Sequence, residues 1–362
     1  MAHHTNQHAA AETKGLRPSE TEDAESTRLA QDASREQNWK RWGAYLSERQ
    51  WGTVREDYSD YGNCWDYFPH DHARSRVYRW GEDGLFGFSD RQARICFSIA
   101  LWNGKDPILK ERLFGLTGPE GNHGEDVKEL YYYLDATPTA SYLRGLYKYP
   151  QQEYPYARLV EENRRRGKHE SELELIDTGV LDGDKYYDVT VEYAKADPED
   201  IFVRITIDSR SPEAATLHVL PTLWFRNTWS YGGDNAARRP ELHAKSASAV
   251  DVFHPELGEY EIAFEPSPAL RELLFTENET NAERVFGVTS VTPYTKDAFH
   301  RRVVNGQLNA TNPEKKGTKV AAWYELEVPA RGKVVILARL RRRSQSVSAA
   351  FGPSFEHVFR ER

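Results

Sequence analysis

The chain has 362 residues, and its 48 Lys and Arg against 56 Asp and Glu give a net charge of −8, without the basic stripe that nucleic-acid binders carry. No stretch approaches the ~18 consecutive apolar residues of a membrane span. The first residues lack the apolar core of a secretory signal, and two cysteines cannot form a disulfide framework. We therefore expect a soluble, cytoplasmic globular protein with neither nucleic-acid nor membrane partners.

The amino-terminal region, residues 1–36, is predicted to be a disordered polar tail. It contains no aromatic residue, no Val and no Ile, so it cannot bury enough apolar surface to offset chain entropy. A short helix is predicted next, over about 34–49, because Trp39, Trp42 and Leu46 recur at helical spacing.

From about residue 95 the apolar pattern has period two, which is typical of strands with one buried face. The alternating segments are 95–101, 187–193, 201–208, 217–225, 250–264, 320–328 and 333–340. Strands at this spacing, with few long helical patterns between them, favour a mostly-β fold, a large antiparallel sandwich. No linker or fixed-period repeat interrupts the region, so residues 37–343 are predicted to form one domain.

The last segment, 344–362, is predicted to be a linker and the start of a helix. Phe351, Phe355, Val358 and Phe359 fall on one helical face, which requires a partner surface. Two interpretations remain open here. The helix folds back onto the sandwich, or the chain ends where a second domain should begin.

Four segments hold more polar and aromatic side chains than a sandwich core requires. They are 65–84, 116–126, 130–156 and 223–234. Sugars stack on Trp and Tyr rings and bind carboxylates, His and Arg through their hydroxyls, so this composition favours a carbohydrate-type surface.

The first segment contains His70, Asp71 and His72. If it were a strand, only His70 and His72 could converge on a metal, because adjacent side chains point to opposite faces. A saccharide site fits better than a metal site, and we expect no metal or other cofactor. Asp71 could instead form a structural ion pair with Arg74 or Arg76.

The second segment is rich in glycine and is predicted to be a loop. Its glycines do not match a phosphate-binding loop. Glu120, Glu125 and Asp126 could supply paired carboxylates, since glycoside hydrolysis needs one protonated carboxylic acid and one carboxylate. Any chain with 56 acidic residues can offer such pairs, so the loop alone does not identify an acid and a base.

The third segment is tyrosine-rich, which is consistent with ordinary strand packing, an interdomain surface or a sugar platform. The fourth leaves a predicted strand, so Arg226, Asn227 and Trp229 are expected at the rim of a sheet.

Residues 47–59, 65–84, 116–129 and 220–229 resemble the amino-terminal part of bacterial glucosidase-like proteins. These belong to glycoside hydrolase family sixty-three and are related to mannosyl-oligosaccharide glucosidase. The resemblance extends over about 38–343, nearly all of the chain after the tail.

The resemblance implies an amino-terminal β-super-sandwich that packs on a carboxy-terminal (α/α)₆ toroid. In the family, the toroid carries the acid and base of an inverting mechanism, and loops of the sandwich approach the pocket. No toroid-sized sequence follows residue 340 here, so the resemblance implies the sandwich half alone, as a truncated or split-gene product, with no catalytic residue carried over. The implied substrates are glucosyl-containing oligosaccharides, and the implied partner is the toroid, in cis or in trans.

Six residues are expected closest to the substrate: His70, Asp71, Asn122, His123, Glu125 and Asp126. Two alternatives remain. The first is a non-catalytic carbohydrate-binding or scaffold protein. The second is a complete enzyme that uses Glu120, Glu125 or Asp126.

Overall fold

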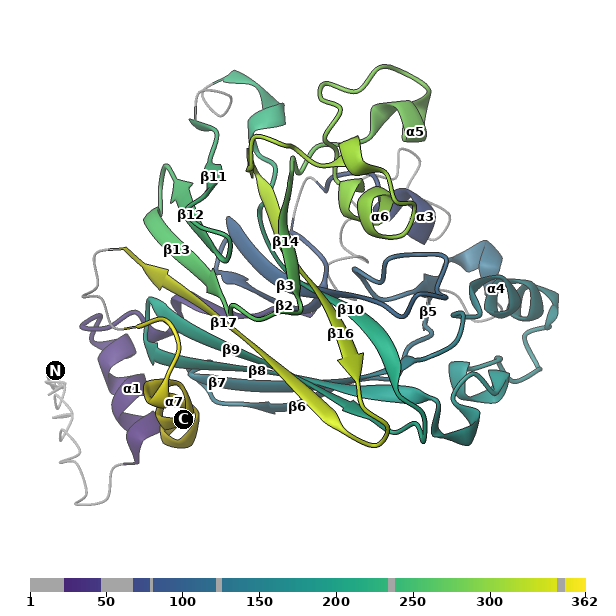
Figure 1. The fold of residues 1–362 in the computed structure, drawn as a ribbon, viewed down its shortest axis with the longest axis horizontal. Helices are drawn as coiled ribbons and strands as arrows, with labels where there is room; N and C mark the ends of the chain where they lie inside the picture. Colours follow the sequence, from purple (N-terminus) through teal and green to yellow (C-terminus); the bar gives the residue numbers. More distant parts are fainter. Residues whose placement is uncertain (1–22, 47–67, 79–80, 122–125, 234–237, 344–348) are drawn as a thin grey trace, which may run out of the picture.

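The computed structural model describes residues 23–46, 68–78, 81–121, 126–233, 238–343 and 349–362. Two large antiparallel sheets face each other and form a β-sandwich, with short helices at its ends and on its outer faces (Figure 1). The predicted mostly-β sandwich is thereby confirmed.

The smaller of the two sheets has six strands. In spatial order they are β1 (Trp42–Ala44), β2 (Leu85–Asp90), β3 (Ile95–Trp102), β10 (Ala215–Phe225), β16 (Lys319–Val328) and β14 (Leu270–Thr276). All neighbours in this sheet pair antiparallel.

The larger sheet has nine strands, also paired antiparallel. In spatial order they are β15 (Lys316–Gly317), β11 (Glu241–Ala244), β12 (Ala249–His254), β13 (Gly258–Phe264), β17 (Lys333–Arg342), β9 (Asp200–Ser209), β8 (Tyr186–Asp197), β7 (Tyr142–Pro150) and β6 (Tyr131–Ala136). A separate two-stranded ladder joins β4 (Gly115–Leu116) to β5 (Asp126–Val127).

The main core lies between the two sheets, where the period-two pattern directs alternate side chains. Phe97 and Ile99 of β3 pack there with Val191 of β8 and Ile205 of β9. The outward side chains of the six-stranded sheet meet a second, smaller apolar cluster under α6 (Ala298–Val303), which includes Phe299. Both faces of the six-stranded sheet are therefore covered at α6.

Further short helices are α3 (His70–Ala73), α4 (Tyr156–Arg165) and α5 (Ala282–Phe286). In Figure 1, α3, α5 and α6 gather at one corner of the six-stranded sheet, and α4 lies on the same right-hand side, where its first residue, Tyr156, stacks on His70 of α3.

Part of the predicted amino-terminal tail is a helix, α1 (Ala24–Ala33). Asp23 caps it by accepting hydrogen bonds from the backbone of Glu25 and Ser26. The Glu25 carboxylate then accepts bonds from Thr139 and Ser141 in the connection between β6 and β7. Tertiary contacts thus order residues 23–36, against the prediction, while residues 1–22 lie outside the described ranges.

The predicted helix over 34–49 is wrong where the structure describes it. Trp39–Arg41 form one 3₁₀ turn, and the chain then enters β1, which pairs with β2. Trp42 is buried and stacks on Phe88 with ring centroids 6.1 Å apart. The i, i+3 spacing of the two tryptophans thus spans a turn and a strand, and both side chains still reach the interior.

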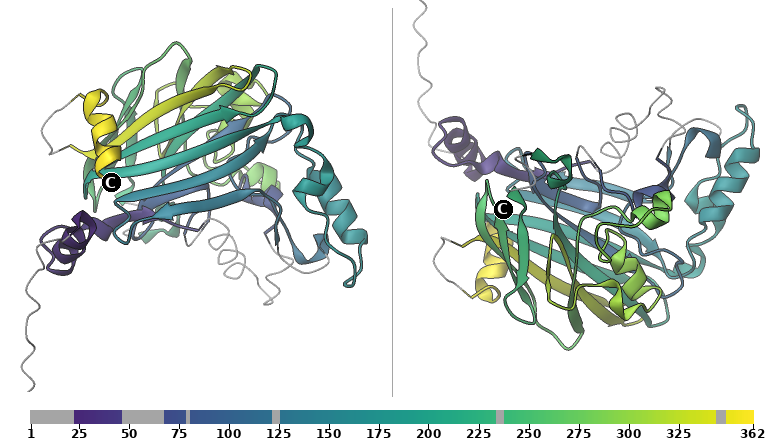
Figure 2. Two further views of the ribbon diagram at one scale, coloured as in Figure 1. Left: turned by 90° about the horizontal axis from the view of Figure 1, so that it is seen from below. Right: turned by 90° about the horizontal axis from the view of Figure 1, so that it is seen from above.

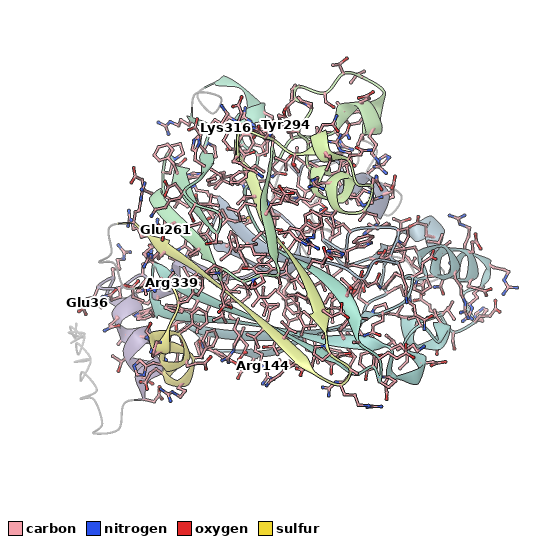
Figure 3. The ribbon with its side chains drawn as sticks, viewed as in Figure 1. Glu36, Arg144, Glu261, Tyr294, Lys316 and Arg339 are labelled. Carbon is pink, nitrogen blue, oxygen red and sulfur yellow. The ribbon has the colours of Figure 1, made fainter. Side chains whose placement is uncertain are left out.

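The predicted last helix is present as α7 (Pro353–Glu361). Phe355 and Val358 are buried against Ala194 and Phe202 on the outer face of the nine-stranded sheet. Beside it, Arg339 (labelled in Figure 3) pairs with Asp200 and donates to a backbone carbonyl just before the helix. This agrees with the interpretation that the helix folds back onto the sandwich.

Helices α1 and α7 lie at the same end of the molecule, as all views in Figures 1 and 2 agree. Arg362 connects the two regions: its Nε donates to the carbonyl of Lys195 over 2.6 Å, and its guanidinium lies 5.6 Å from the ring centre of Trp39. Arg362 therefore links the end of α7 to β8 and to the segment that follows α1.

Candidate functional site

His70 and Asp71 lie in the four-residue helix α3, which begins directly after Pro69. In a helix, side chains two positions apart point in different directions, so His70 and His72 do not converge as they would on a strand. The described residues contain no group of three His, Cys, Asp or Glu side chains placed to hold a metal ion.

His70 is buried in an aromatic environment. Its ring lies edge-on to Phe114 at 5.2 Å and stacks on Tyr156 at 6.0 Å between centroids. Burial, reinforced by Lys110 and Arg112, holds the pKa of His70 well below its usual value, so the imidazole is neutral near pH 7. Its Nε2 has no hydrogen-bond partner within the described part of the chain.

Asp71 lies at the surface, with 62% of its side chain exposed. Its Oδ1 is 2.6 Å from Arg284 of α5 and 3.3 Å from Arg74. Arg284 also donates to the Asp71 carbonyl and to Ser75, so it ties α3 to α5. The structural ion pair considered for Asp71 and Arg74 is therefore present.

The glycine-rich loop is only partly described. Asn122, His123 and Glu125 lie outside the described residues, and the side chain of Asp126 does too, although its backbone forms β5 opposite β4. Glu120 accepts hydrogen bonds from the backbone and hydroxyl of Thr117, at 3.0 and 2.9 Å. This reciprocal cap engages the Glu120 carboxylate in closing a 3₁₀ turn.

The tyrosine-rich segment mostly packs inside the protein. Tyr147, Tyr149 and Tyr154 are fully buried, and their hydroxyls donate to Glu129, Asp106 and the carbonyl of Lys128. Buried tyrosines with satisfied hydroxyls support the ordinary-packing interpretation for this part of the segment.

A cluster of buried charges lies elsewhere, on the outer face of the six-stranded sheet, around a cavity of ≈ 20 Å³. We call it the charged cavity. Its lining residues are Glu82, Asp83, Gly84, Ser98, Ala100, Glu111, Arg112, Thr222, Trp224, Asn278, Lys296 and Lys319. A cavity of this size holds about one water molecule.

The floor of the charged cavity comes from strand residues that point away from the main core. Ser98 of β3 and Thr222 and Trp224 of β10 lie there because their neighbours Phe97 and Leu223 point inward. The outer face carries polar atoms at this end, where α6 does not cover it.

The extended segment 82–84, directly before β2, forms the roof, and Gly84 allows it to approach the sheet. Gly84 has φ +141°, and a Cβ there would lie 2.7 Å from Ser98 and 3.3 Å from Trp224. Only glycine meets both the backbone angle and the close approach without strain.

The carboxylates of the charged cavity are held by specific donors. Asp83 accepts from Arg112 Nε at 2.8 Å and from the Tyr78 hydroxyl at 2.6 Å. The other two carboxylates are held in the same way: Lys319 donates to Glu111 at 2.7 Å, and Asn278 donates to Glu82 at 3.1 Å.

The environments of these groups separate their pKa values. Burial raises the pKa of Glu82 to about 7, and the neighbouring Asp83 adds to the rise. Burial also acts on Asp83, but Arg112 and Lys296 outweigh it and lower the pKa of that carboxyl. Burial lowers the pKa of Lys296 to about 8. Perturbed, buried titratable groups around one cavity mark a candidate functional site.

The sequence analysis missed this site. The run Glu82-Asp83-Gly84 lies inside a segment that it singled out, but no pattern linked that run to Arg112 or Lys296. The rim predicted from the fourth segment does adjoin the cavity. Asn227 follows β10 and donates to the carbonyl of Asn278, which lines the cavity.

No protein-family model matches this sequence. The chain is 46% identical over 334 residues to the uncharacterized protein YMR196W of Saccharomyces cerevisiae. That alignment covers 84% of this chain and 31% of the yeast protein, so the chain spans about a third of the length of the relative it matches. Among the described residues, no helix has both the length and the apolar character needed to cross a lipid bilayer.

Proposed function

We propose that this chain is the amino-terminal sandwich domain of an inverting, glucosidase-type glycoside hydrolase acting on glucosyl-containing oligosaccharides in the cytoplasm. Its role is to support and cap an (α/α)₆ catalytic domain, which supplies the acid and base. The chain alone is not expected to turn over substrate.

One observation carries the proposal. The aligned 334 residues make up 31% of the yeast relative, so a closely similar sequence occurs there within a polypeptide about three times as long.

The geometry of the charged cavity favours a structural role for this chain rather than a catalytic one. A glycosidase needs two carboxyl groups about 5–10 Å apart with a sugar ring between them. Glu82, Asp83 and Glu111 instead surround a cavity of ≈ 20 Å³, far smaller than a sugar ring, and each is held by a buried donor.

An exposed apolar patch beside α5 is the proposed docking surface for the catalytic domain. Phe286, Val288 and Val291 are 56%, 56% and 84% exposed, next to the Arg284–Asp71 pair. Apolar side chains gathered at one exposed place commonly mark a protein interface. The patch also lies at the corner where α3, α5 and α6 gather (Figure 1), so a domain bound there would reach Asp71.

The test is hydrolysis of a panel of α-glucosides and gluco- and mannobiosides. It compares the chain alone with the chain extended by the coding sequence that follows it in the genome. Turnover only by the extended protein supports the proposal, and clear turnover by the chain alone contradicts it. Sugar binding without turnover in either form favours the non-catalytic carbohydrate-binding alternative.

A matched pair of variants tests the docking surface within the extended protein. Val291→Ser is expected to weaken the association of the two domains and lower turnover. Ile176→Ser is the control, because Ile176 is also exposed, at 64%, but lies on the 3₁₀ turn Leu175–Thr178, away from α5. Equal effects of both substitutions would exclude this surface.

A further inference from the structure

We propose that the charged cavity is an anion-binding site, which holds one monovalent ion of the size of chloride between Arg112 and Lys296. The ion would bind there whichever function the sandwich serves.

The first observation is a buried ammonium without a counterion in contact. Lys296 is 3% exposed, and within the described residues no carboxylate lies within the 4.0 Å of an ion pair with it. Its Nζ donates to the carbonyl of Arg76 over 2.9 Å and lies 3.9 Å from the ring centre of Tyr78. Buried charges in proteins are normally paired in contact, whereas Asp83 and Glu82 act on Lys296 only from beyond ion-pair distance, so this ammonium can still take an anion in direct contact.

The second observation is an unsatisfied donor on another residue that lines the cavity. Arg112 is 5% exposed, and its Nε is bonded to Asp83. Its buried Nη1 has no hydrogen-bond acceptor among the described residues, since Glu111, the nearest carboxylate on that side, is 4.0 Å away. A buried guanidinium N–H without a hydrogen-bond acceptor costs free energy of folding, so we expect an acceptor to occupy the cavity.

The size of the cavity selects the kind of acceptor. At ≈ 20 Å³ it admits one water-sized particle, which excludes a sugar ring, a phosphate or a carboxylate ligand. A water molecule would satisfy Nη1 of Arg112 but leave Lys296 without an anion in contact. A chloride ion meets both needs.

The surrounding charges also allow an anion. Asp83 and Glu111 are neutralised by Arg112 and Lys319, so Glu82 is the remaining negative group that faces Lys296. The pKa of Glu82 is about 7, so protonation of this carboxyl below neutral pH leaves the cavity with an excess positive charge. Anion binding should therefore tighten as the pH falls through about 7.

The direct test is a crystal structure of the chain grown with sodium bromide, with data collected at the bromine absorption edge. The expected result is an anomalous peak in the charged cavity, within contact distance of Arg112 Nη1 and Lys296 Nζ. A cavity that contains only water in these crystals would overturn the proposal. A cavity peak no stronger than peaks scattered over the surface would mean an adventitious ion only and would also overturn it.

The solution test is thermal unfolding at constant ionic strength, with chloride replacing gluconate. A ligand that binds only the folded state raises Tm with a saturable dependence on its concentration. Lys296→Met is expected to weaken chloride binding about tenfold or more, because it removes a charged hydrogen-bond donor worth about 1.5–3 kcal/mol. A chloride response equal to that of gluconate would contradict the site.

Two further variants keep the test informative. Lys148→Met is the control, since Lys148 also lies over a tyrosine ring, that of Tyr186 at 4.7 Å, but already pairs with Asp188. It should leave the chloride response intact. Glu82→Gln should keep chloride binding and remove the part of its pH dependence centred near pH 7, leaving the loss of binding as Lys296 deprotonates above about pH 8. A loss of binding in this variant at pH 7 would contradict the assigned charge balance.

Discussion

Arg112 and Asp83 form a buried ion pair, with Nε 2.8 Å from Oδ2 and both side chains less than a tenth exposed. The Tyr78 hydroxyl donates to the same carboxylate oxygen. The pair fixes the 82–84 segment over the sheet, so the shape of the charged cavity depends on it.

Arg112→Met is predicted to lower the free energy of unfolding by about 3–5 kcal/mol, because it leaves Asp83 charged and buried without its cation. The control is Arg271→Met, which breaks an exposed pair with Glu325 and should cost below about 1 kcal/mol. Urea denaturation measures both. Similar losses of unfolding free energy in the two variants would show that the buried pair contributes no more to stability than the exposed pair.

The stability of the protein should depend on the protonation of Glu82. Its pKa rises from an ordinary 4.5 to about 7 on folding, so the folded state binds more protons between these values. The free energy of unfolding contributed by Glu82 is therefore largest at low pH and falls as the pH rises through about 7. Lys296 acts in the opposite sense at higher pH. Its pKa falls from 10.5 to about 8, so its contribution improves as the pH rises above about 8.

Glu82→Gln isolates the first of these effects. Buried His254 and half-buried His300, each with a pKa lowered to about 4, make the folded state gain stability with pH over part of the same window, so the wild-type curve alone does not isolate Glu82. The difference between wild type and Glu82→Gln should decline between about pH 5 and about pH 7.5 in urea denaturation. A difference that stays constant would show that Glu82 does not titrate there.

Gly84→Ala is predicted to destabilise the fold by more than about 2 kcal/mol, because strain in the backbone adds to a contact that nothing relieves. The new Cβ would meet Ser98 at 2.7 Å, in a backbone conformation with φ +141°. Gly104→Ala is the matched control: its φ is +76°, with nothing within 4 Å of the added Cβ. It should cost about 1 kcal/mol. Equal Tm shifts in the two variants would argue against close packing of the 82–84 segment.

Asp71→Ala tests whether an exposed residue of the candidate set contacts sugar. Its ion pairs are at the surface, so the free energy of unfolding should change by under about 1 kcal/mol. In the extended protein, KM for glucosyl oligosaccharides should rise about tenfold if one charged hydrogen bond to substrate is lost. Asp184→Ala, at an equally exposed carboxylate near Arg331, is the control and should leave KM unchanged. An unchanged KM in Asp71→Ala would remove Asp71 from the substrate site.

Local patterns in the sequence were sufficient to predict most of the strands. The alternation in 201–208 and 333–340 corresponds to β9 and β17, which pair in register with each other. Period two is a local property, and each strand has one face turned toward the core, so it can be read without knowing the partner strand. The apolar face of α7 could be predicted for the same reason, because it too follows from spacing within one element.

Tertiary contacts overruled local patterns at the amino-terminal end. The composition of residues 23–36 is that of a tail, but Glu25 finds donors on Thr139 and Ser141, more than a hundred residues away. The helical spacing of Trp39 and Trp42 was misleading, because pairing of β1 with β2 satisfies the backbone there instead.

An acidic charge, a mostly-β fold and a short helix with one apolar face near residues 353–361 could be predicted from the sequence, because these properties follow from composition and from spacing along one element. Where the buried charges meet depends on tertiary contacts instead. Glu82, Arg112 and Lys296 come from three segments separated by 30 and 184 residues, counted as 112 − 82 and 296 − 112. Their burial and mutual field, which set the pKa of Glu82 near 7, exist only once the sheet brings those segments together.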